Sequence, residues 1–226
     1  MDDLQTLTLG DIATSWPGAT RVFGRFGLDF CCGGRRTLAE ACRAAGLDPR
    51  AILDELSAGP GGADRGDLSV WATAPLADLV TYLTDVVHAR LRDDLPELVR
   101  LASAVDRAHA QHPSYSPEVT PLLVDLAADL VDHMAVEEKL LFPQVLAARA
   151  AASGTTVRGL EDDHQRAGAA LARLRVLTHD YTAPADGCPT WRALMSGLAR
   201  FAQELTEHVH LENNVLFPRA MCERGQ

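Results

Sequence analysis

Long stretches of the chain place apolar residues three or four positions apart, which is the spacing of an amphipathic helix. Four such stretches follow Pro75, at about 76–110, 118–150, 156–180 and 189–222. The segments between them are short and contain Pro113, Gly154 and Pro184, which are residue types typical of loops. Four long helices with short connections predict an up-down-up-down bundle.

The first part of the chain carries shorter helical patterns, from Thr8 to about Ser57. They include a Thr37-x-x-Glu40 capping box, the signature of a helix start. The nine residues 58–66 contain four glycines and a proline, so persistent structure is not expected there. We therefore predict a small helical domain at 1–57, a Gly/Pro linker at 58–70, and the bundle at 71–226.

Composition supports an all-α protein and excludes several function classes. Of the 226 residues 47% are hydrophobic, but only 5% are aromatic, which favours helices over sheets. A net charge of −10 argues against a nucleic-acid partner. No stretch approaches the ~18 apolar residues of a membrane span, and the N-terminus is acidic, so we expect no membrane partner and a cytoplasmic location. The five cysteines show no disulfide framework, and we expect reduced thiols.

An internal repeat marks the candidate chemistry. His133-x-x-x-Glu137 precedes Leu141-Phe142-Pro143, and His208-x-x-x-Glu212 precedes Leu216-Phe217-Pro218, so the matched residues are offset by 75. His88 and His164 lie on the helices before these two units and are offset by 76. The repeating unit is one histidine on a helix and His-x-x-x-Glu on the next.

This pattern predicts a metal site with two cations. Residues at i and i+4 share a helix face, and in antiparallel hairpins His88 and His164 lie at nearly the depth of His133 and His208. A single histidine is more often structural than a ligand, but the repeated set at one depth favours metal binding. Mixed nitrogen and oxygen ligands suit iron or manganese better than structural zinc. The other histidines lie outside the repeat, and we predict that they are not ligands: His109, His112, His179 and His210.

The adjacent cysteines Cys31 and Cys32 admit two interpretations. Neighbouring cysteines pair with each other only through a strained ring, so they suit thiolate exchange, metal handling or nitrosation. They are equally compatible with two small residues packed at a turn. Gly33 and Gly34 favour an exposed, tightly turned backbone.

Together, Asp-Phe-Cys-Cys-Gly-Gly at 29–34, the Gly/Pro linker and the two His-x-x-x-Glu units with Leu-Phe-Pro resemble the bacterial iron–sulfur cluster repair di-iron proteins (repair of iron centres). The resemblance covers nearly the whole chain. It implies a haemerythrin-like domain with two bridged non-haem irons held by the six residues of the repeat: His88, His133, Glu137, His164, His208 and Glu212. It also implies repair of clusters damaged by nitrosative or oxidative stress, through iron delivery or reduction of nitric oxide to nitrous oxide.

The resemblance further points to acids that line a channel to the site, here Asp129 and Asp163, where family members commonly carry glutamate. Glu138 is a weaker candidate. The expected partners are nitric oxide or dioxygen, damaged iron–sulfur proteins and an unidentified electron donor. Two alternatives are a haemerythrin-like dioxygen carrier and a nitric oxide or iron sensor that acts through a protein partner. Carriers have a second histidine four positions along the third helix, where this chain has Gly168.

Overall fold

The computed structural model describes residues 6–57, 68–147 and 154–222. In these ranges the chain forms helices and no β-strand, apart from an isolated antiparallel bridge between Thr8 and Thr37. The all-α prediction is confirmed. No helix in the described ranges is long and apolar enough to cross a membrane.

The chain divides into two compact units. One contains residues 1–80, 145–152 and 206–226, and the other contains residues 81–144 and 153–205. Of the predicted linker, residues 58–67 lie outside the described ranges, and residues 68–70 begin the 3₁₀ helix η2 (Leu68–Ala72).

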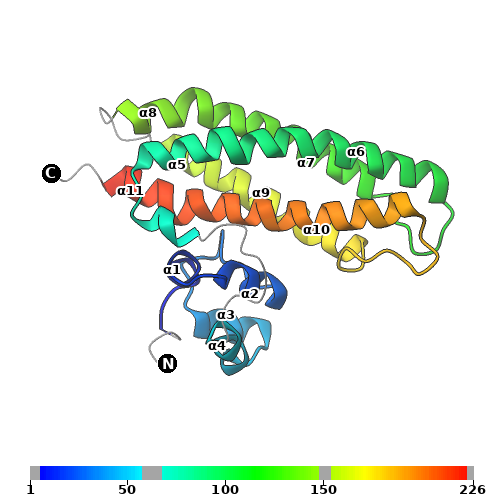
Figure 1. Cartoon of the computed structure of the whole chain (residues 1–226), viewed down its shortest axis with the longest axis horizontal. Coiled ribbons are helices and arrows are strands. Elements are labelled where there is room, and N and C mark those ends of the chain that lie inside the picture. Colours follow the sequence, from blue (N-terminus) through cyan, green and yellow to red (C-terminus); the bar gives the residue numbers. More distant parts are fainter. Residues whose placement is uncertain (1–5, 58–67, 148–153, 223–226) are drawn as a thin grey trace. The chain divides into compact units, whose positions relative to one another are not determined.

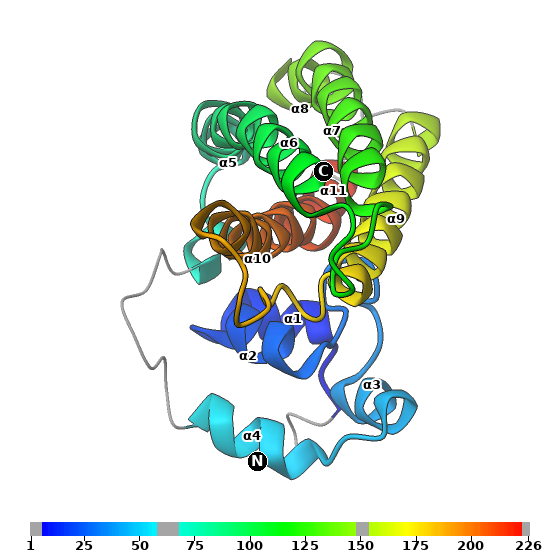
Figure 2. The same cartoon turned by 90° about the vertical axis from the view of Figure 1, so that its right-hand side faces the viewer.

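The second unit is built from four long helices (Figure 1). They lie close to the predicted positions in the sequence and are separated by short segments. They are η3 (Leu83–His88) continuing into α6 (Ala89–His109), α7 (Val119–Val136) continuing into η4 (Glu137–Leu141), α9 (Gly154–Leu177) and most of α10 (Pro189–His210). Figure 2 looks nearly along these helices and shows them side by side.

Apolar side chains at helical spacing form the interior of this bundle. On α6, Leu91, Leu95 and Leu98 are each at most 2% exposed. Helix α10 approaches α6 closely at Gly197, where a Cβ atom would lie 2.8 Å from Leu98 Cδ2. A small residue is therefore needed at this crossing.

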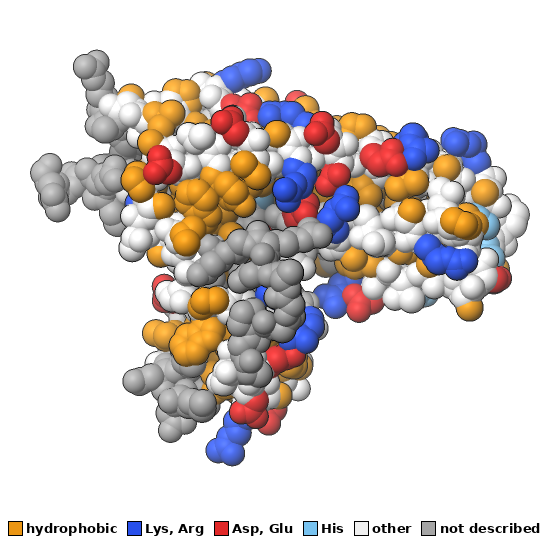
Figure 3. All heavy atoms as spheres, in the orientation of Figure 1, with side chains coloured by type: hydrophobic (Ala, Val, Ile, Leu, Met, Phe, Trp, Pro, Cys, Tyr) orange, Lys and Arg blue, Asp and Glu red, His pale blue; other side chains and the backbone are white. Residues whose placement is uncertain are grey.

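Charged side chains lie on the outside of the bundle, among exposed apolar ones such as Val131 and Leu140. Figure 3 shows basic and acidic side chains lying next to one another on its surface. Two such pairs join α6 to α10: Arg90 to Glu204 at 3.4 Å and Arg200 to Asp94 at 3.3 Å. Exposed pairs of this kind contribute little stability individually.

The first unit contains the N-terminal helices and the end of the chain. Its elements are α1 (Leu9–Ser15), α2 (Ala19–Phe26), α3 (Leu38–Ala45), α4 (Pro49–Ser57), η2, most of α5 (Leu76–Tyr82), the end of α8 (Phe142–Ala147), the last turn of α10, η5 (Leu211–Leu216) and α11 (Phe217–Cys222). The predicted capping box is present, because Thr37 accepts a hydrogen bond from the Glu40 N–H and the Glu40 carboxylate accepts one from the Thr37 N–H. Phe23 and Phe30 meet in the apolar core at 5.9 Å between ring centroids.

Candidate metal centre

Three helices change to π-helix where the predicted ligands lie. The π-helical segment η3 ends at His88, η4 begins at Glu137, and η5 contains Glu212. A π-helical turn is rare, and single turns of this kind occur frequently at functional sites. The hydrophobic period of the sequence did not predict these turns.

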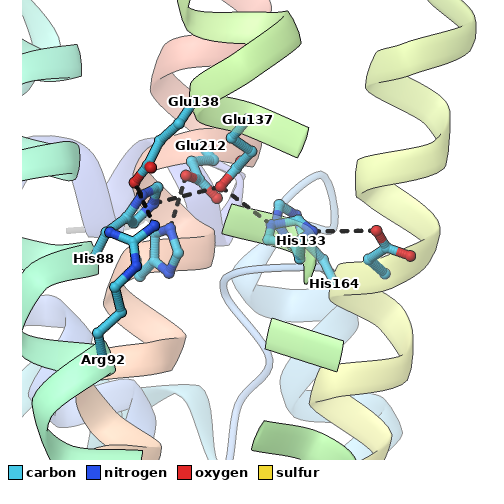
Figure 4. A network of polar contacts seen from close by, with 9 residues as sticks. His88, Arg92, His133, Glu137, Glu138, His164 and Glu212 are labelled. Carbon is cyan, nitrogen blue, oxygen red and sulfur yellow. Dashed lines mark hydrogen bonds and ion pairs between the residues drawn. The ribbon is translucent and has the colours of Figure 1, made fainter. Parts of the chain in front are cut away.

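Four of the six predicted ligands come together inside the bundle unit (Figure 4). His88, His133, Glu137 and His164 are at most 4% exposed. The ligand atoms of His133, Glu137 and His164 all lie within 4.8 Å of one another. His88 and His133 each place Nε2 at 3.4 Å from Glu137 Oε2, and the Nε2 atoms of His133 and His164 are 3.0 Å apart.

Carboxylates on neighbouring helices orient two of these imidazoles. His88 Nδ1 lies 2.8 Å from Glu138 Oε1, and Arg92 donates to the same oxygen at 2.8 Å. Burial alone would raise the pKa of Glu138, but hydrogen bonds from His88 and Arg92 outweigh it and hold the pKa below its ordinary value. Because a carboxylate only accepts hydrogen bonds, His88 carries its proton on Nδ1. In the neutral imidazole that a metal ligand requires, Nε2 then turns a lone pair toward Glu137.

His133 has a similar carboxylate partner. Its Nδ1 lies 3.2 Å from Asp163 Oδ2, and Arg166 pairs with the other carboxylate oxygen. His133 Nε2 then also presents a lone pair. A carboxylate hydrogen-bonded to a ligand histidine is the usual arrangement around protein-bound metals, where it fixes the tautomer and the ring orientation.

The surroundings of Glu137 indicate whether these residues fit a metal. Both of its carboxylate oxygens are buried, and no hydrogen-bond donor from the described part of the chain reaches either one. The carboxylate instead faces Nε2 lone pairs of His88 and His133. Electron pairs that face one another in a buried site are unfavourable unless a cation lies among them. The nitrogen and oxygen donors fit iron.

The remaining two predicted ligands lie in the first unit. His208 Nε2 is 2.7 Å from Glu212 Oε1, and both residues are at most 1% exposed. His210, two residues after His208, is also buried but contacts the N-terminal helices, with Nε2 at 3.3 Å from Thr14 Oγ1 and its ring 5.5 Å from that of Phe30. Burial lowers the pKa of His210 to about 4, so it is neutral at physiological pH.

A cavity of about 220 Å³ lies between α7 and α9 and reaches His133 and His164. Both predicted channel acids, Asp129 and Asp163, line it, together with Asp125 and Asp132. Glu138 is not among the lining residues, since it is engaged with His88. The cavity therefore places four carboxylates and Arg166 along the same wall as two of the ligand imidazoles.

The Cys31–Cys32 turn lies in the first unit and contains free thiols. The two Sγ atoms are 3.8 Å apart, and the Cys31 thiol lies 3.3 Å from Asp29 Oδ1. The same Asp29 oxygen accepts a hydrogen bond from the Cys32 N–H at 2.9 Å, which shapes the turn. The hydrogen bond to Cys32, burial and the charge of Asp29 raise the pKa of Cys31. Cys31 therefore holds its proton at neutral pH.

A separate polar cluster surrounds Trp191 at the other end of α10. His109 and His112 lie 5.0 and 5.1 Å from the Trp191 ring, between centroids, so neither is near the predicted ligands of the bundle unit. Cys188 precedes the first turn of α10 and accepts a hydrogen bond from the Trp191 N–H at 3.4 Å. That bond, with one from the His109 side chain, lowers the pKa of Cys188 to about 7.

Both parts of the chain match known protein domains. The profile of the hemerythrin HHE cation binding domain matches residues 79–220, and that of a domain of unknown function (DUF542, ScdA_N) matches residues 5–59. Among similar proteins, one from Musicola paradisiaca is 40% identical over 97% of both chains, and one from Dickeya chrysanthemi is 39% identical over the same share. A protein of Escherichia coli O157:H7 is 37% identical over 95% of this chain and 96% of its own. All three bear the name iron-sulfur cluster repair protein YtfE.

Proposed function

This chain belongs to the family of iron–sulfur cluster repair proteins with a hemerythrin HHE domain, as its motifs predicted, and we propose that it repairs damaged iron–sulfur clusters by means of a di-iron centre. The observation that carries the proposal is Glu137, a buried carboxylate that faces two imidazole nitrogens and that no hydrogen-bond donor reaches from the residues the structure describes.

The proposed centre uses all six residues of the repeat. His88, His133, Glu137 and His164 converge in the bundle unit, and His208 and Glu212 form the matching pair on the continuation of α10. The hemerythrin profile spans all six positions. We propose that Glu137 and Glu212 would each hold iron together with the histidine one turn before it, because residues at i and i+4 share a helix face in both halves of the repeat.

When bound, an iron pair supplies open coordination positions and electron exchange for a small gas such as nitric oxide or dioxygen. The residues of the chain shape the surroundings. Asp163 and Glu138 hold His133 and His88 in the required tautomers, and the acidic cavity with Asp129 offers a route for a cation or a small neutral gas.

Repair then has two candidate routes, which are iron donation to the damaged protein and reduction of nitric oxide at the centre. Cys31 and Cys32 are proposed to serve the first, as soft ligands that accept ferrous iron or a nitrosyl group in transit. Their Sγ atoms and the Asp29 carboxylate lie within 4.8 Å of one another, which suits brief binding of one cation. The free thiols also support a reducing, cytoplasmic location.

A dioxygen carrier is the alternative, and the third bundle helix argues against it. Helix α9 provides His164, but the position one turn later is Gly168. This helix therefore offers a single imidazole, whereas the carrier pattern needs two.

The test uses anaerobically reconstituted protein and a [4Fe–4S] protein damaged by nitric oxide. We expect about two irons per chain, recovery of the damaged cluster, and a slower recovery with Cys31→Ser/Cys32→Ser at unchanged iron content. Cys188→Ser is the matched control and should repair at the normal rate. Labelled iron in the client indicates donation, and nitrous oxide indicates reduction.

Three outcomes contradict parts of the proposal. A reproducible single zinc without iron refutes the di-iron centre. Normal repair by the double-serine variant removes the delivery role of the cysteines. Loss of iron from that variant would make the cysteines ligands of the resident centre.

A further inference from the structure

Two asparagines that follow Glu212 hold the double-cysteine turn. Asn214 Nδ2 donates to the carbonyl of Cys31 at 3.1 Å and to that of Phe30 at 3.3 Å. Asn213 Nδ2 donates to the same Cys31 carbonyl at 3.3 Å. All of these residues lie in the first unit, although more than 180 positions separate the partners along the chain. The turn that carries the thiols is therefore bound to the π-helical turn η5, which carries Glu212.

The surroundings of Asn214 are fitted to its amide group. A Cβ atom on Gly34 would lie 2.3 Å from Asn214 Oδ1, and one on Gly10 would lie 2.6 Å from it. Real Cβ atoms do not approach this closely, so both positions need glycine while Asn214 stays in place. The His210 ring adds a contact from the other side, with Nδ1 at 3.2 Å from Asn214 Nδ2.

We propose that Asn214, assisted by Asn213, is a positioning residue that holds the Cys31 and Cys32 thiols at the π-helical turn of Glu212, so that their reactivity depends on whether Glu212 is bound to metal. This inference rests on the proposed role of Glu212 as an iron ligand. Asn214 would thereby couple the iron site to the thiols, which the ligands and the cysteines do not do by themselves.

The coupling follows from the short path between the two groups. Glu212 and Asn214 belong to the same six-residue π-helical segment, and a π-helical turn is less stable than the α-helical turns around it. A metal that binds the Glu212 carboxylate fixes the register of this turn, and with it the Asn214 amide. Release of the metal frees the turn to shift, and the hydrogen bonds to the Phe30 and Cys31 carbonyls then weaken.

Asp29 fixes the same turn through a second group, the Cys32 N–H, at 2.9 Å. Asp29 and Asn214 therefore both hold the turn that carries the thiols, and both cysteines are only partly exposed. Loss of the Asn214 contacts leaves the Asp29 hydrogen bond and the longer one from Asn213. The turn then opens more often and exposes the thiols to reagents and clients.

The test compares alkylation rates of Cys31 and Cys32 by iodoacetamide, read by peptide mapping of the full, iron-loaded chain. Asn214→Asp keeps the size of the side chain but removes the N–H donors. It should alkylate about fivefold to tenfold faster, because a local opening equilibrium shifts by about 1 kcal/mol when the two hydrogen bonds to the Phe30 and Cys31 carbonyls, which share one amide group, are lost. Cys188, in the other unit, serves as the internal reference in the same digest and should not change.

Two glycine variants approach the contact from the opposite side. Gly34→Ala crowds Asn214 and should also raise the rate, whereas Gly24→Ala is the matched control, because a Cβ there meets nothing within 4 Å. If both Asn214→Asp and Gly34→Ala alkylate at the wild-type rate, Asn214 does not position the thiols.

Metal dependence tests the coupling itself. Removal of iron should accelerate alkylation of the wild type, and should have little effect on Asn214→Asp, in which the connection is already broken. If metal-free and iron-loaded wild type react at equal rates, the coupling is refuted. Iron per chain is measured separately, so a failure of the six-ligand proposal would show as a lost iron, whatever the thiol rates.

Discussion

Replacement of Glu137 with methionine should have opposite effects on the stability of the metal-free and the iron-loaded protein. Glu137 is fully buried, its two oxygens have no donor in the described residues, and the Nε2 atoms of His88 and His133 each lie 3.4 Å from its Oε2. Methionine is of similar size and adapts to irregular space. The variant therefore removes an unsatisfied polar group without leaving a cavity.

The magnitude follows from this environment. A buried polar group without a partner costs about 1–3 kcal/mol, and an uncompensated buried charge about 3–5 kcal/mol. We expect Glu137→Met to raise the unfolding free energy of the metal-free protein by about 2–3 kcal/mol. This corresponds to a rise of roughly 5–10 °C in its Tm at this chain length. With iron at a thousandfold excess over Kd the order reverses, because the variant then forgoes a stabilisation of about 4.1 kcal/mol, which exceeds its gain in the metal-free state.

Thermal unfolding followed by circular dichroism, with and without a chelator, measures both effects. Glu97→Met is the matched control, because Glu97 is an exposed residue of α6 whose carboxylate pairs only with Arg100 at the surface in the described structure. It should change the Tm little in either state. A metal-free Glu137→Met protein that melts at or below the wild-type Tm would refute the reasoning that Glu137 awaits a cation.

Two further predictions concern residues outside this carboxylate. Glu212→Ala should abolish binding of at least one iron, whereas His210→Ala should keep both, because His210 contacts Thr14 and Phe30 of the N-terminal segment. Equal iron loss from the two variants would show that His210 is a ligand. The alkylation rate of Cys188 should rise with pH through a midpoint near 7, since the Trp191 N–H stabilises the thiolate and lowers its pKa, and a midpoint near 9 in a rate–pH profile would contradict this.

Features governed by local rules could be predicted from the sequence. The long helices begin and end close to the expected positions, because proline, glycine and the hydrophobic period act within a few residues. The Thr37–Glu40 capping box is a three-residue rule and is present. His133 and Glu137 face each other because i and i+4 share a helix face.

Features that depend on distant contacts or on irregular helix geometry could not be predicted. A π-helical turn inserts one residue into the hydrogen-bond ladder without a clear mark in the apolar pattern, so that pattern does not predict the three turns at His88, Glu137 and Glu212. Asn213 and Asn214 read as ordinary polar residues after a ligand, since their partners lie more than 180 positions away.

The two carboxylates that orient the imidazoles share an arrangement, and it explains why metal-free Glu137→Met should melt at a higher temperature than the wild type. Glu138 adjoins Glu137 on the α7–η4 helix and orients His88 on the preceding helix, while Asp163 adjoins His164 on α9 and orients His133 on the helix before it. Each helix thus provides a ligand and also fixes a ligand of its neighbour. Because helix packing and these hydrogen bonds hold the imidazoles, their geometry does not depend on the metal alone. The site therefore cannot relax fully when iron leaves, and no hydrogen-bond donor among the described residues lies within reach of the Glu137 carboxylate.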